Sequence, residues 1–180
     1  MSRINDLALI TQVTVLHDNR GFDALVRKYQ QQVRRLFLNM TLGDELLSDD
    51  LAQETFIKAY ENLASFKKLS SFQTWLYRIA YNVFYNYIRS RKETADIDSP
   101  EVETSYRTGF QDSTVNDDVN KALQTLKEEE RICVTLQIID DLPIDKIATI
   151  TGMKEGTVKS HLSRGKEKLT NYLRRNGYDR

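Results

Sequence analysis

The feature that most constrains this chain is a pair of amphipathic helical patterns that follow one another between Asp50 and Lys92. In each pattern, apolar residues recur at every third or fourth position, which is the spacing of one helix face. The first set is Leu51, Phe56, Ala59, Tyr60 and Leu63. The second set is Phe72, Trp75, Leu76, Ile79, Ala80, Val83, Phe84 and Tyr87. A polar segment at 67–71 separates them, so the sequence predicts two packed helices joined by a short turn.

The outward face of the second predicted helix combines tyrosines with arginines and asparagines. The residues left outside its apolar seam are Gln73, Tyr77, Arg78, Tyr81, Asn82, Tyr85, Asn86 and Arg89. An aromatic ring can stack on an unpaired base, and a guanidinium group can meet a phosphate. The pattern therefore indicates a contact with single-stranded nucleic acid. The alternative, open for each tyrosine taken singly, is that its ring belongs to the core.

The remaining composition supports an all-α protein with two small domains. The chain has 180 residues, of which 40% are apolar and 29% are charged, as in ordinary folded domains. It contains only two Pro and seven Gly, so long uninterrupted helices are possible. Few segments alternate with the period of two that strands show.

The net charge of zero hides two mildly basic regions and an acidic one. Residues 1–91 contain 12 Lys and Arg against 9 Asp and Glu, and residues 120–180 also contain 12 against 9. Between them, residues 92–119 contain 2 against 8. Such a distribution is compatible with nucleic-acid binding by the basic regions. The neutral total predicts only weak binding to free DNA.

No cofactor, metal site or export signal is expected. Cys133 is the one cysteine, so no internal disulfide can form, and its apolar neighbours predict a buried thiol. His17 and His161 have no second ligand at metal spacing. The chain lacks a basic-then-apolar leader and any apolar run near the ~18 residues of a transmembrane helix. The expected location is the cytoplasm, without membrane insertion.

Another helix is expected before the opening pair. Its apolar face is Phe22, Leu25, Tyr29, Val33, Leu36 and Phe37. Its other face carries Arg27, Lys28, Arg34 and Arg35, either as solvated cations or as contacts to duplex DNA. After a loop at 40–44, Ser48 or Asp49 is expected to cap the next helix, which is predicted to begin near residue 50.

These patterns divide the chain into two domains and a linker. Three helices are expected to form a first domain over residues 1–91. The acidic segment 92–117 contains few large apolar residues, which is typical of a flexible linker. Residues 118–180 are helical again and are expected to form the second domain.

The second domain is predicted to end in a helix-turn-helix. Ala148 allows two helices to approach closely, Gly152 can take the positive φ of a tight turn, and Val158 packs the second helix on the first. The segment GTVKSHLSRGKEKL that follows presents a polar set outward, namely Lys159, Ser160, Ser163, Arg164 and Lys166. A helix whose N-terminal end enters the major groove places such residues near base edges and phosphates. An ordinary basic surface helix is the alternative.

Two sequence blocks together resemble one protein family. DLAQETF followed by FQTWLYRIAYN is similar to domain two of bacterial RNA polymerase sigma factors of the extracytoplasmic-function (group IV) type. The segment around GTVKSHLSRGKEKL resembles sigma domain four, which recognises the −35 promoter element. The resemblance covers nearly the whole chain, and the large intervening domain of housekeeping sigma factors has no room here.

The resemblance implies three sets of contact residues and no catalytic residue. Docking on the clamp helices of core RNA polymerase would use Asp50, Gln53, Glu54, Lys58 and Glu61. Capture of the opened −10 element would use Lys67, Lys68, Ser70, Ser71, Phe72, Arg78, Asn82, Tyr85 and Arg89. The −35 element would meet the five outward residues of the helix-turn-helix. The family places the linker in the polymerase cleft, toward the RNA exit path. The exposed apolar and charged faces expected on both domains further predict sequestration by an anti-sigma factor.

Two departures from the family pattern and two other classes of protein bear on this interpretation. His161 replaces a usual arginine, and Gly165 replaces a usual alanine at a cost of ~1 kcal/mol in helix propensity. A stand-alone helix-turn-helix regulator would leave the 50–91 block without a role. An enzyme acting on nucleic acid would need a metal or carboxylate cluster, which Asp49, Asp50 and Glu54 alone do not make.

Overall fold

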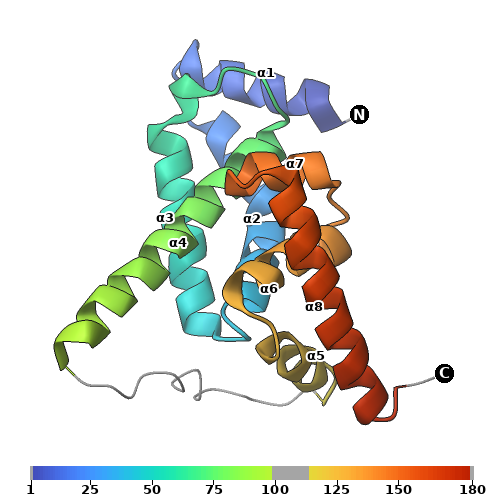
Figure 1. Cartoon of the computed structure of the whole chain (residues 1–180). Helices are drawn as coiled ribbons and strands as arrows, with labels where there is room; N and C mark the ends of the chain where they lie inside the picture. The colour runs from blue at the N-terminus through green and yellow to red at the C-terminus, as the bar shows by residue number, and fades with distance from the viewer. Residues whose placement is uncertain (1, 99–113, 179–180) are drawn as a thin grey trace.

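The computed structural model describes the backbone of residues 2–98 and 114–178, and within them the protein is entirely helical (Figure 1). The N-terminal lobe contains α1 (Ser2–Thr14), α2 (Arg20–Met40), α3 (Glu45–Glu61), a 3₁₀ turn η1 (Leu63–Ser65) and α4 (Phe72–Asp98). The C-terminal lobe contains α5 (Thr114–Gln124), α6 (Glu128–Val134), a π-helical segment η2 (Thr135–Ile139), α7 (Ile144–Thr151) and α8 (Glu155–Arg175). The predicted all-α class with two helical domains is confirmed.

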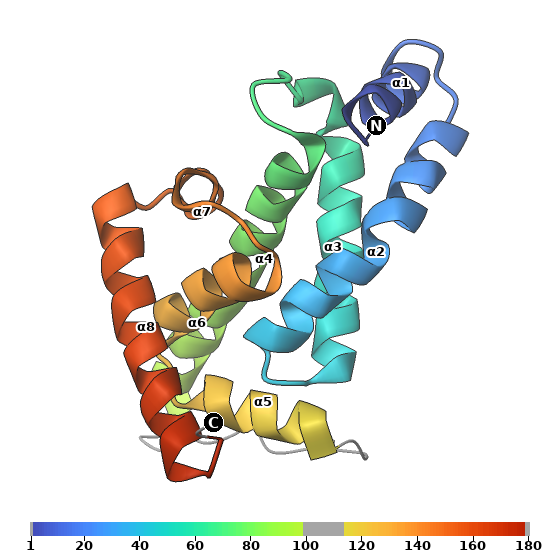
Figure 2. The same ribbon diagram turned by 90° about the vertical axis from the view of Figure 1, so that its right-hand side faces the viewer.

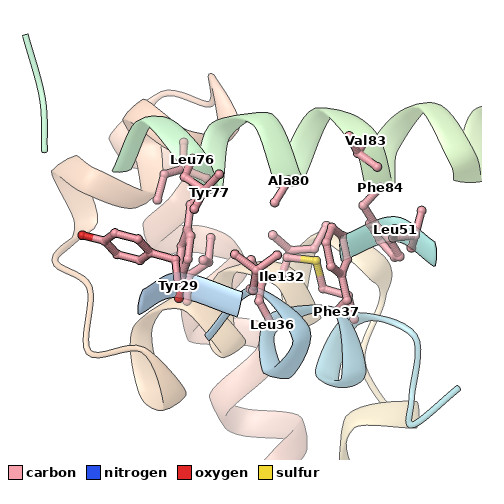
Figure 3. Packing of buried hydrophobic residues seen from close by; sticks show 14 of the residues in the cluster. Tyr29, Leu36, Phe37, Leu51, Leu76, Tyr77, Ala80, Val83, Phe84 and Ile132 are labelled. Atoms are coloured by element: carbon pink, nitrogen blue, oxygen red, sulfur yellow. The ribbon is translucent and has the colours of Figure 1, made fainter. Parts of the chain in front are cut away.

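The N-terminal lobe is held by apolar side chains that face inward from α2, α3 and α4. Leu36, Leu51 and Leu76 are each no more than 3% exposed, and all belong to one hydrophobic cluster. Figure 3 shows Leu76, Ala80 and Phe84 of α4 directed toward α2. The three helices expected from periodicity are therefore present. Helix α1 was not predicted as an element; it packs on α2, with Ile10 buried.

The predicted start of α3 was wrong by five residues. The helix begins at Glu45, because the Asp44 carboxylate accepts a hydrogen bond from the Leu47 N–H at 3.0 Å and so acts as the N-cap. Ser48, one of the two expected caps, is buried inside the first turns, with its Oγ 2.8 Å from the Thr41 Oγ1. Asp49 is instead an ion-pair partner of Arg34.

The burial of two tyrosines differs from the prediction made from helical periodicity. Tyr60, expected in the core, is 44% exposed and donates its hydroxyl to Asn19 at 2.9 Å. Tyr77, expected outside, is 0% exposed. Tyr77 is buried because α7 packs on α4. Helical periodicity within one lobe cannot reveal such a contact between lobes.

In the C-terminal lobe, α7 and α8 form the expected helix-turn-helix. α7 ends at Thr151, and Gly152 follows with a φ of 73°, the left-handed conformation predicted for the turn. Val158, at 0% exposed, packs the second helix inward. Pro143 immediately precedes the first residue of α7 and serves as its N-cap.

Helices α6 and α8 approach closely at Gly165. A Cβ atom built on Gly165 would lie 2.7 Å from the Cγ2 of Val134, which is 2% exposed. The side chain of Val134 is β-branched and has little rotamer freedom on a helix. The glycine that departs from the family pattern therefore has a packing role in this chain.

A buried carboxylate joins the same two helices. Glu130 of α6 is 2% exposed, and it accepts hydrogen bonds from the Lys168 Nζ of α8 at 2.6 Å and from the Lys127 N–H at 3.0 Å. Arg164 Nε lies 3.7 Å away. Burial on its own would raise the pKa of Glu130, but the Lys168 and Lys127 hydrogen bonds, with Arg164 nearby, outweigh it and hold the pKa below its ordinary value.

The two lobes pack against each other along α4. Figure 2 shows α4 between α2 and α3 on one side and α6, α7 and α8 on the other, and contacts of α3 and α7 with α4 support this view. Ile132 of α6 is 4% exposed and lies beside Leu36 of α2 in Figure 3. One hydrophobic cluster thus extends through both lobes.

The helices flanking the expected linker extend into it. Helix α4 continues to Asp98, and α5 begins at Thr114. Most of the segment predicted as a flexible linker lies outside the described residues. In the described part, no helix is long and apolar enough to span a membrane.

Replacing Gly165 with alanine is expected to destabilise the C-terminal lobe by about 1–3 kcal/mol, because the overlap with Val134 exceeds the gain in helix propensity. Gly156→Ala is the matched control, since open space surrounds that position on the same helix. It should leave stability unchanged or raise it by a few tenths of a kcal/mol. Chemical denaturation of both full-length variants compares them, and an unchanged midpoint for Gly165→Ala would contradict the packing role.

Glu130→Gln is expected to cost roughly 1–3 kcal/mol at pH 7, because Lys168 and Arg164 lose their anionic partner. Since the folded-state pKa lies below the ordinary value of 4.5, this stabilisation is present above pH 4.5 and disappears as the pH falls through the folded-state pKa. Denaturation midpoints of wild type and variant should therefore converge in acid. Glu129→Gln, at an exposed neighbour, should show no such difference at any pH.

Candidate polymerase and promoter interfaces

The outward face of α3 is polar and accessible. Asp50, Gln53, Glu54 and Glu61 are exposed, and Lys58 is half-buried beside its ion-pair partner Glu54 at 3.2 Å. Thr55 and Ala59, on the inner side of the helix, are 0% exposed. The predicted polymerase-docking residues therefore share one solvent-facing surface, which we call the α3 face.

An apolar residue that the sequence reasoning missed lies in the middle of the α3 face. Ile57 is 51% exposed, between the exposed positions Gln53 and Glu61, each four residues away. In a protein contact such a side chain would add buried apolar area, while the surrounding charges would give orientation. The exposure of Ile57 could have been predicted from the sequence, because its position falls outside the apolar seam of α3.

Four predicted −10 residues form a stripe along α4. Arg78, Asn82, Tyr85 and Arg89 are all exposed, and their spacing of three or four residues places them on one helix face. Tyr85 stacks on Tyr81, with ring centroids 6.1 Å apart and planes at 27°. The Tyr85 ring is 55% exposed, so part of its surface stays open to solvent beside Tyr81.

Not every charge on this stripe is available for a phosphate. Arg89 donates its Nε to Glu93 at 2.9 Å, one turn further along α4. The hydrogen bond from Arg89 to Glu93 raises the pKa of the guanidinium, which stays protonated. A nucleic-acid phosphate at Arg89 must therefore replace or share an existing carboxylate contact.

The loop before α4 borders a cavity of about 220 Å³. It is lined by Asp6, Leu7, Phe66, Lys68, Ser70, Ser71 and Phe72. The loop contains Lys67 and Lys68, which are exposed, and Ser70 and Ser71, which are half-buried. Lys68 has a positive φ of 59°, an uncommon conformation for a residue other than glycine. Leu69 at the tip is 90% exposed and was absent from the predicted set.

Phe72 is the one predicted −10 residue that the structure buries. Its side chain is 3% exposed, and its ring lies 5.4 Å from the Tyr29 ring and 5.6 Å from the Trp75 ring. Its ring therefore forms a wall of the cavity behind the loop, as its place in the predicted apolar seam of the helix indicates, and its part in −10 capture stays a prediction. The aromatic packing explains the inward rotation, because Phe66 also meets the ring at 5.9 Å.

The five predicted −35 residues share the outer surface of α8. Lys159, Ser160, Ser163, Arg164 and Lys166 are all exposed. Val158 and Leu162 lie one helical turn apart on the inner face of α8 and are at most 4% exposed, which fixes the rotation of the helix. Lys154, Glu155 and Thr157 are exposed at the N-terminal end of α8 and extend this surface beyond the predicted set.

The described residues offer no grouping of three or more His, Cys, Asp or Glu side chains suited to a metal ion. Cys133 is fully buried as predicted, and burial, with Glu129 nearby, raises the pKa of its thiol to about 12. The thiol is therefore protonated at neutral pH and acts as a small apolar residue.

Comparison with known families and proteins fits these surfaces. The Sigma-70 region 2 family matches residues 25–94, and the Sigma-70 region 4 family matches residues 116–169. The chain is 32% identical to the ECF RNA polymerase sigma-E factor of Escherichia coli (strain K12) over 183 aligned residues, which cover 94% of each chain. It is 33% identical to the RNA polymerase sigma-H factor of Pseudomonas aeruginosa, over 87% of this chain and 88% of the relative.

Solved structures agree in fold. The sigma factor RpoE of Bartonella quintana, crystallised with the anti-sigma factor NepR, matches with a TM-score of 0.70 and 25% identity over 86% of this chain and 98% of that chain. CnrH, solved in complex with the cytosolic domain of CnrY, matches in fold with a TM-score of 0.67 and 22% identity over 95% and 96% of the two chains. With region 2 carrying the α3 face and the α4 stripe, and region 4 carrying the helix-turn-helix, the chain belongs to the extracytoplasmic-function sigma factors of the sigma-70 family.

Proposed function

We propose that this chain is the promoter-specificity subunit that binds core RNA polymerase through the α3 face, captures the opened −10 element with α4 and the loop before it, and reads the −35 element with α8. The observation that carries the assignment is the presence of three accessible surfaces of different chemistry on one family-matched chain. The α3 face is polar and centred on Ile57, the α4 stripe is aromatic and basic, and the outer surface of α8 is polar and basic.

The proposed division of labour follows from the physics of each surface. Charges around the rim of a protein contact set orientation and association rate more than affinity, which suits the α3 face. Stacking on an aromatic ring is worth ~1–3 kcal/mol per base, comparable to the cost of unstacking one step, so the Tyr81–Tyr85 pair can offset local opening of DNA. Base edges in the major groove are read by side chains at the N-terminal part of an inserted helix, which suits Lys159 and Ser163.

The proposed function implies two protein partners, core polymerase and an anti-sigma factor, and action in the cytoplasm. One structural neighbour, at 25% identity, is a sigma factor crystallised with an anti-sigma factor, and we extend binding by such a partner to this chain. The polymerase performs the chemistry of RNA synthesis in the cytoplasm, and this chain contributes recognition. A stand-alone helix-turn-helix regulator would have no use for the α3 face or the α4 stripe.

Run-off transcription with core polymerase tests the assignment directly. The purified chain should direct initiation from a promoter that carries matched −10 and −35 elements, and core polymerase alone should not. Tight binding to a palindromic duplex without polymerase, combined with no initiation, would instead favour the stand-alone regulator.

Gln53→Lys combined with Glu54→Lys is expected to weaken binding to core polymerase roughly 10- to 100-fold, mainly through a slower association rate at low salt. The reason is that both side chains are exposed on the α3 face and make no core contact. Fluorescence-detected titration of core polymerase measures the change. Asp23→Lys, an exposed acid on α2, is the control for charge alone and should bind like wild type. If the double variant bound core polymerase as tightly as wild type, the proposed role of the α3 face would be wrong.

Tyr85→Ala is expected to lower open-complex formation by about 5- to 100-fold, which corresponds to the loss of one stacked base. Tyr85→Phe should retain most activity, because stacking needs the ring and not the hydroxyl. Permanganate reactivity of unpaired thymines measures opening on a duplex promoter. If Tyr85 captures bases after they separate, the alanine variant should also bind a pre-melted promoter more weakly, and equal binding there would argue against a stacking role.

A further inference from the structure

Two side chains hold the Arg164 guanidinium where α6 packs on α8. The Nε of Arg164 lies 3.7 Å from the Oε1 of Glu130, a carboxylate whose side chain is only 3% exposed. The Nη2 of Arg164 lies 3.3 Å from the Nδ1 of His161, three residues earlier on α8. Two of the three guanidinium nitrogens therefore have a partner, although the Arg164 side chain is 57% exposed.

The Glu130 carboxylate is a fixed point for this contact. Its second oxygen, Oε2, accepts hydrogen bonds from the Lys168 Nζ at 2.6 Å and from the Lys127 N–H at 3.0 Å. Burial favours the neutral acid, but these two hydrogen bonds outweigh it and hold the pKa of Glu130 below its ordinary value. At neutral pH, Arg164 is therefore attracted by a buried anion that its other hydrogen bonds keep in place.

The two departures from the family pattern both belong to this contact. A Cβ atom on Gly165 would lie 3.6 Å from the Glu130 Cβ and 2.7 Å from the Val134 Cγ2, so the glycine permits the close approach of α6. A guanidinium group only donates hydrogen bonds, so an arginine in place of His161 would repel Arg164, whereas an unprotonated histidine Nδ1 accepts from it. Both departures thus favour one orientation of the Arg164 side chain.

The same contacts decide which edge of the guanidinium faces outward. Nε and Nη2 of Arg164 form one edge, and both lie next to groups of this chain. The edge between Nη1 and the second N–H of Nη2 has no hydrogen-bond or ion-pair partner within the described residues. Two parallel N–H donors of this kind match the O6 and N7 acceptors that guanine presents in the major groove. An arginine held by no neighbour would lose more rotamer entropy on binding and could equally meet a phosphate.

We propose that Glu130 and His161 are positioning residues that hold Arg164 ready to read one guanine of the −35 element. This inference rests on the proposed function, because it takes α8 to lie in the major groove of that element. Neither residue belongs to the predicted set of −35 contacts, and both act on base preference through Arg164. The orientation of the guanidinium is a property of the free chain and can be measured without polymerase or DNA.

The first test measures the mobility of the Arg164 Nε–H in the free full-length chain by nitrogen NMR relaxation, with Arg164→Lys to identify its signal. The wild-type group should have an order parameter above ~0.6, the value below which a group is flexible. His161→Leu and Glu130→Gln should each lower the order parameter, because each removes one partner. His161→Asn, whose amide oxygen can accept in place of Nδ1, should preserve it, and so should Glu129→Gln at an exposed neighbour.

The second test measures base preference with holoenzyme assembled from core polymerase and each full-length variant. Promoters are selected from a library with a fixed −10 element and a randomised −35 region. Wild type should select guanine at one base pair, and Arg164→Ala should lower that preference about 5- to 100-fold, the value of one bidentate pair. His161→Leu and Glu130→Gln should lower the same preference by at least about fivefold, the lower end of this range, and leave the other base pairs unchanged. His161→Asn should keep the wild-type preference.

A double-mutant cycle separates positioning from folding. In the Arg164→Ala background, His161→Leu should have no further effect at this base pair, because the group through which it acts is gone. A loss of stability alone would weaken selection of all sequences together.

Three results would overturn the inference. They are a mobile Arg164 in the wild-type chain, a guanine preference that His161→Leu and Glu130→Gln both leave intact, and an equal weakening of all sequences by Arg164→Ala, which would indicate a phosphate contact. Run-off transcription by the wild-type chain tests the proposed function separately. Normal initiation together with an intact guanine preference in both variants would remove only this inference.

Discussion

The structure depends on the burial of α4 from two sides at once. Ala80 and Phe84 face the helices of the N-terminal lobe, and Tyr77 lies under α7 of the C-terminal lobe. A helix buried on two sides keeps only an outer stripe for solvent, and Arg78, Asn82, Tyr85 and Arg89 lie on it. The position of these predicted −10 residues is thus a consequence of how α4 is packed, and their rotation is fixed by the buried side chains of the same helix.

Much of the fold follows from periodicity, because apolar spacing reports which face of a helix is buried. Leu51, Leu76 and Val158 were all expected to face inward, and all are buried. The turn at Gly152 was also predictable, since a positive φ at that place needs glycine. The accessible positions of the α3 face and of the five −35 residues follow from the same reasoning applied to the opposite helix faces.

The features that escaped prediction depend on partners far away in the sequence. Tyr77 has the pattern of an outward residue in its own lobe and is buried only because another lobe covers it. Asp44, Ser48 and Asp49 are all good caps in composition, and only the geometry of the first turn shows that Asp44 is used. Gly165 looked like a departure that weakens a helix, whereas the nearness of Val134 makes the missing Cβ a requirement.

The Glu130 carboxylate between α6 and α8 has a consequence for the ionic response of the recognition helix. Lys168 and, at longer range, Arg164 already have this anion as a neighbour before any duplex arrives. A phosphate that approaches them exchanges one negative partner for another, so fewer condensed sodium or potassium ions leave the duplex than the number of basic residues on the helix suggests. The affinity of the C-terminal lobe for promoter DNA should therefore depend less on salt concentration than its number of lysines and arginines implies. Contacts to base edges and the shape of the duplex should contribute more to its sequence specificity.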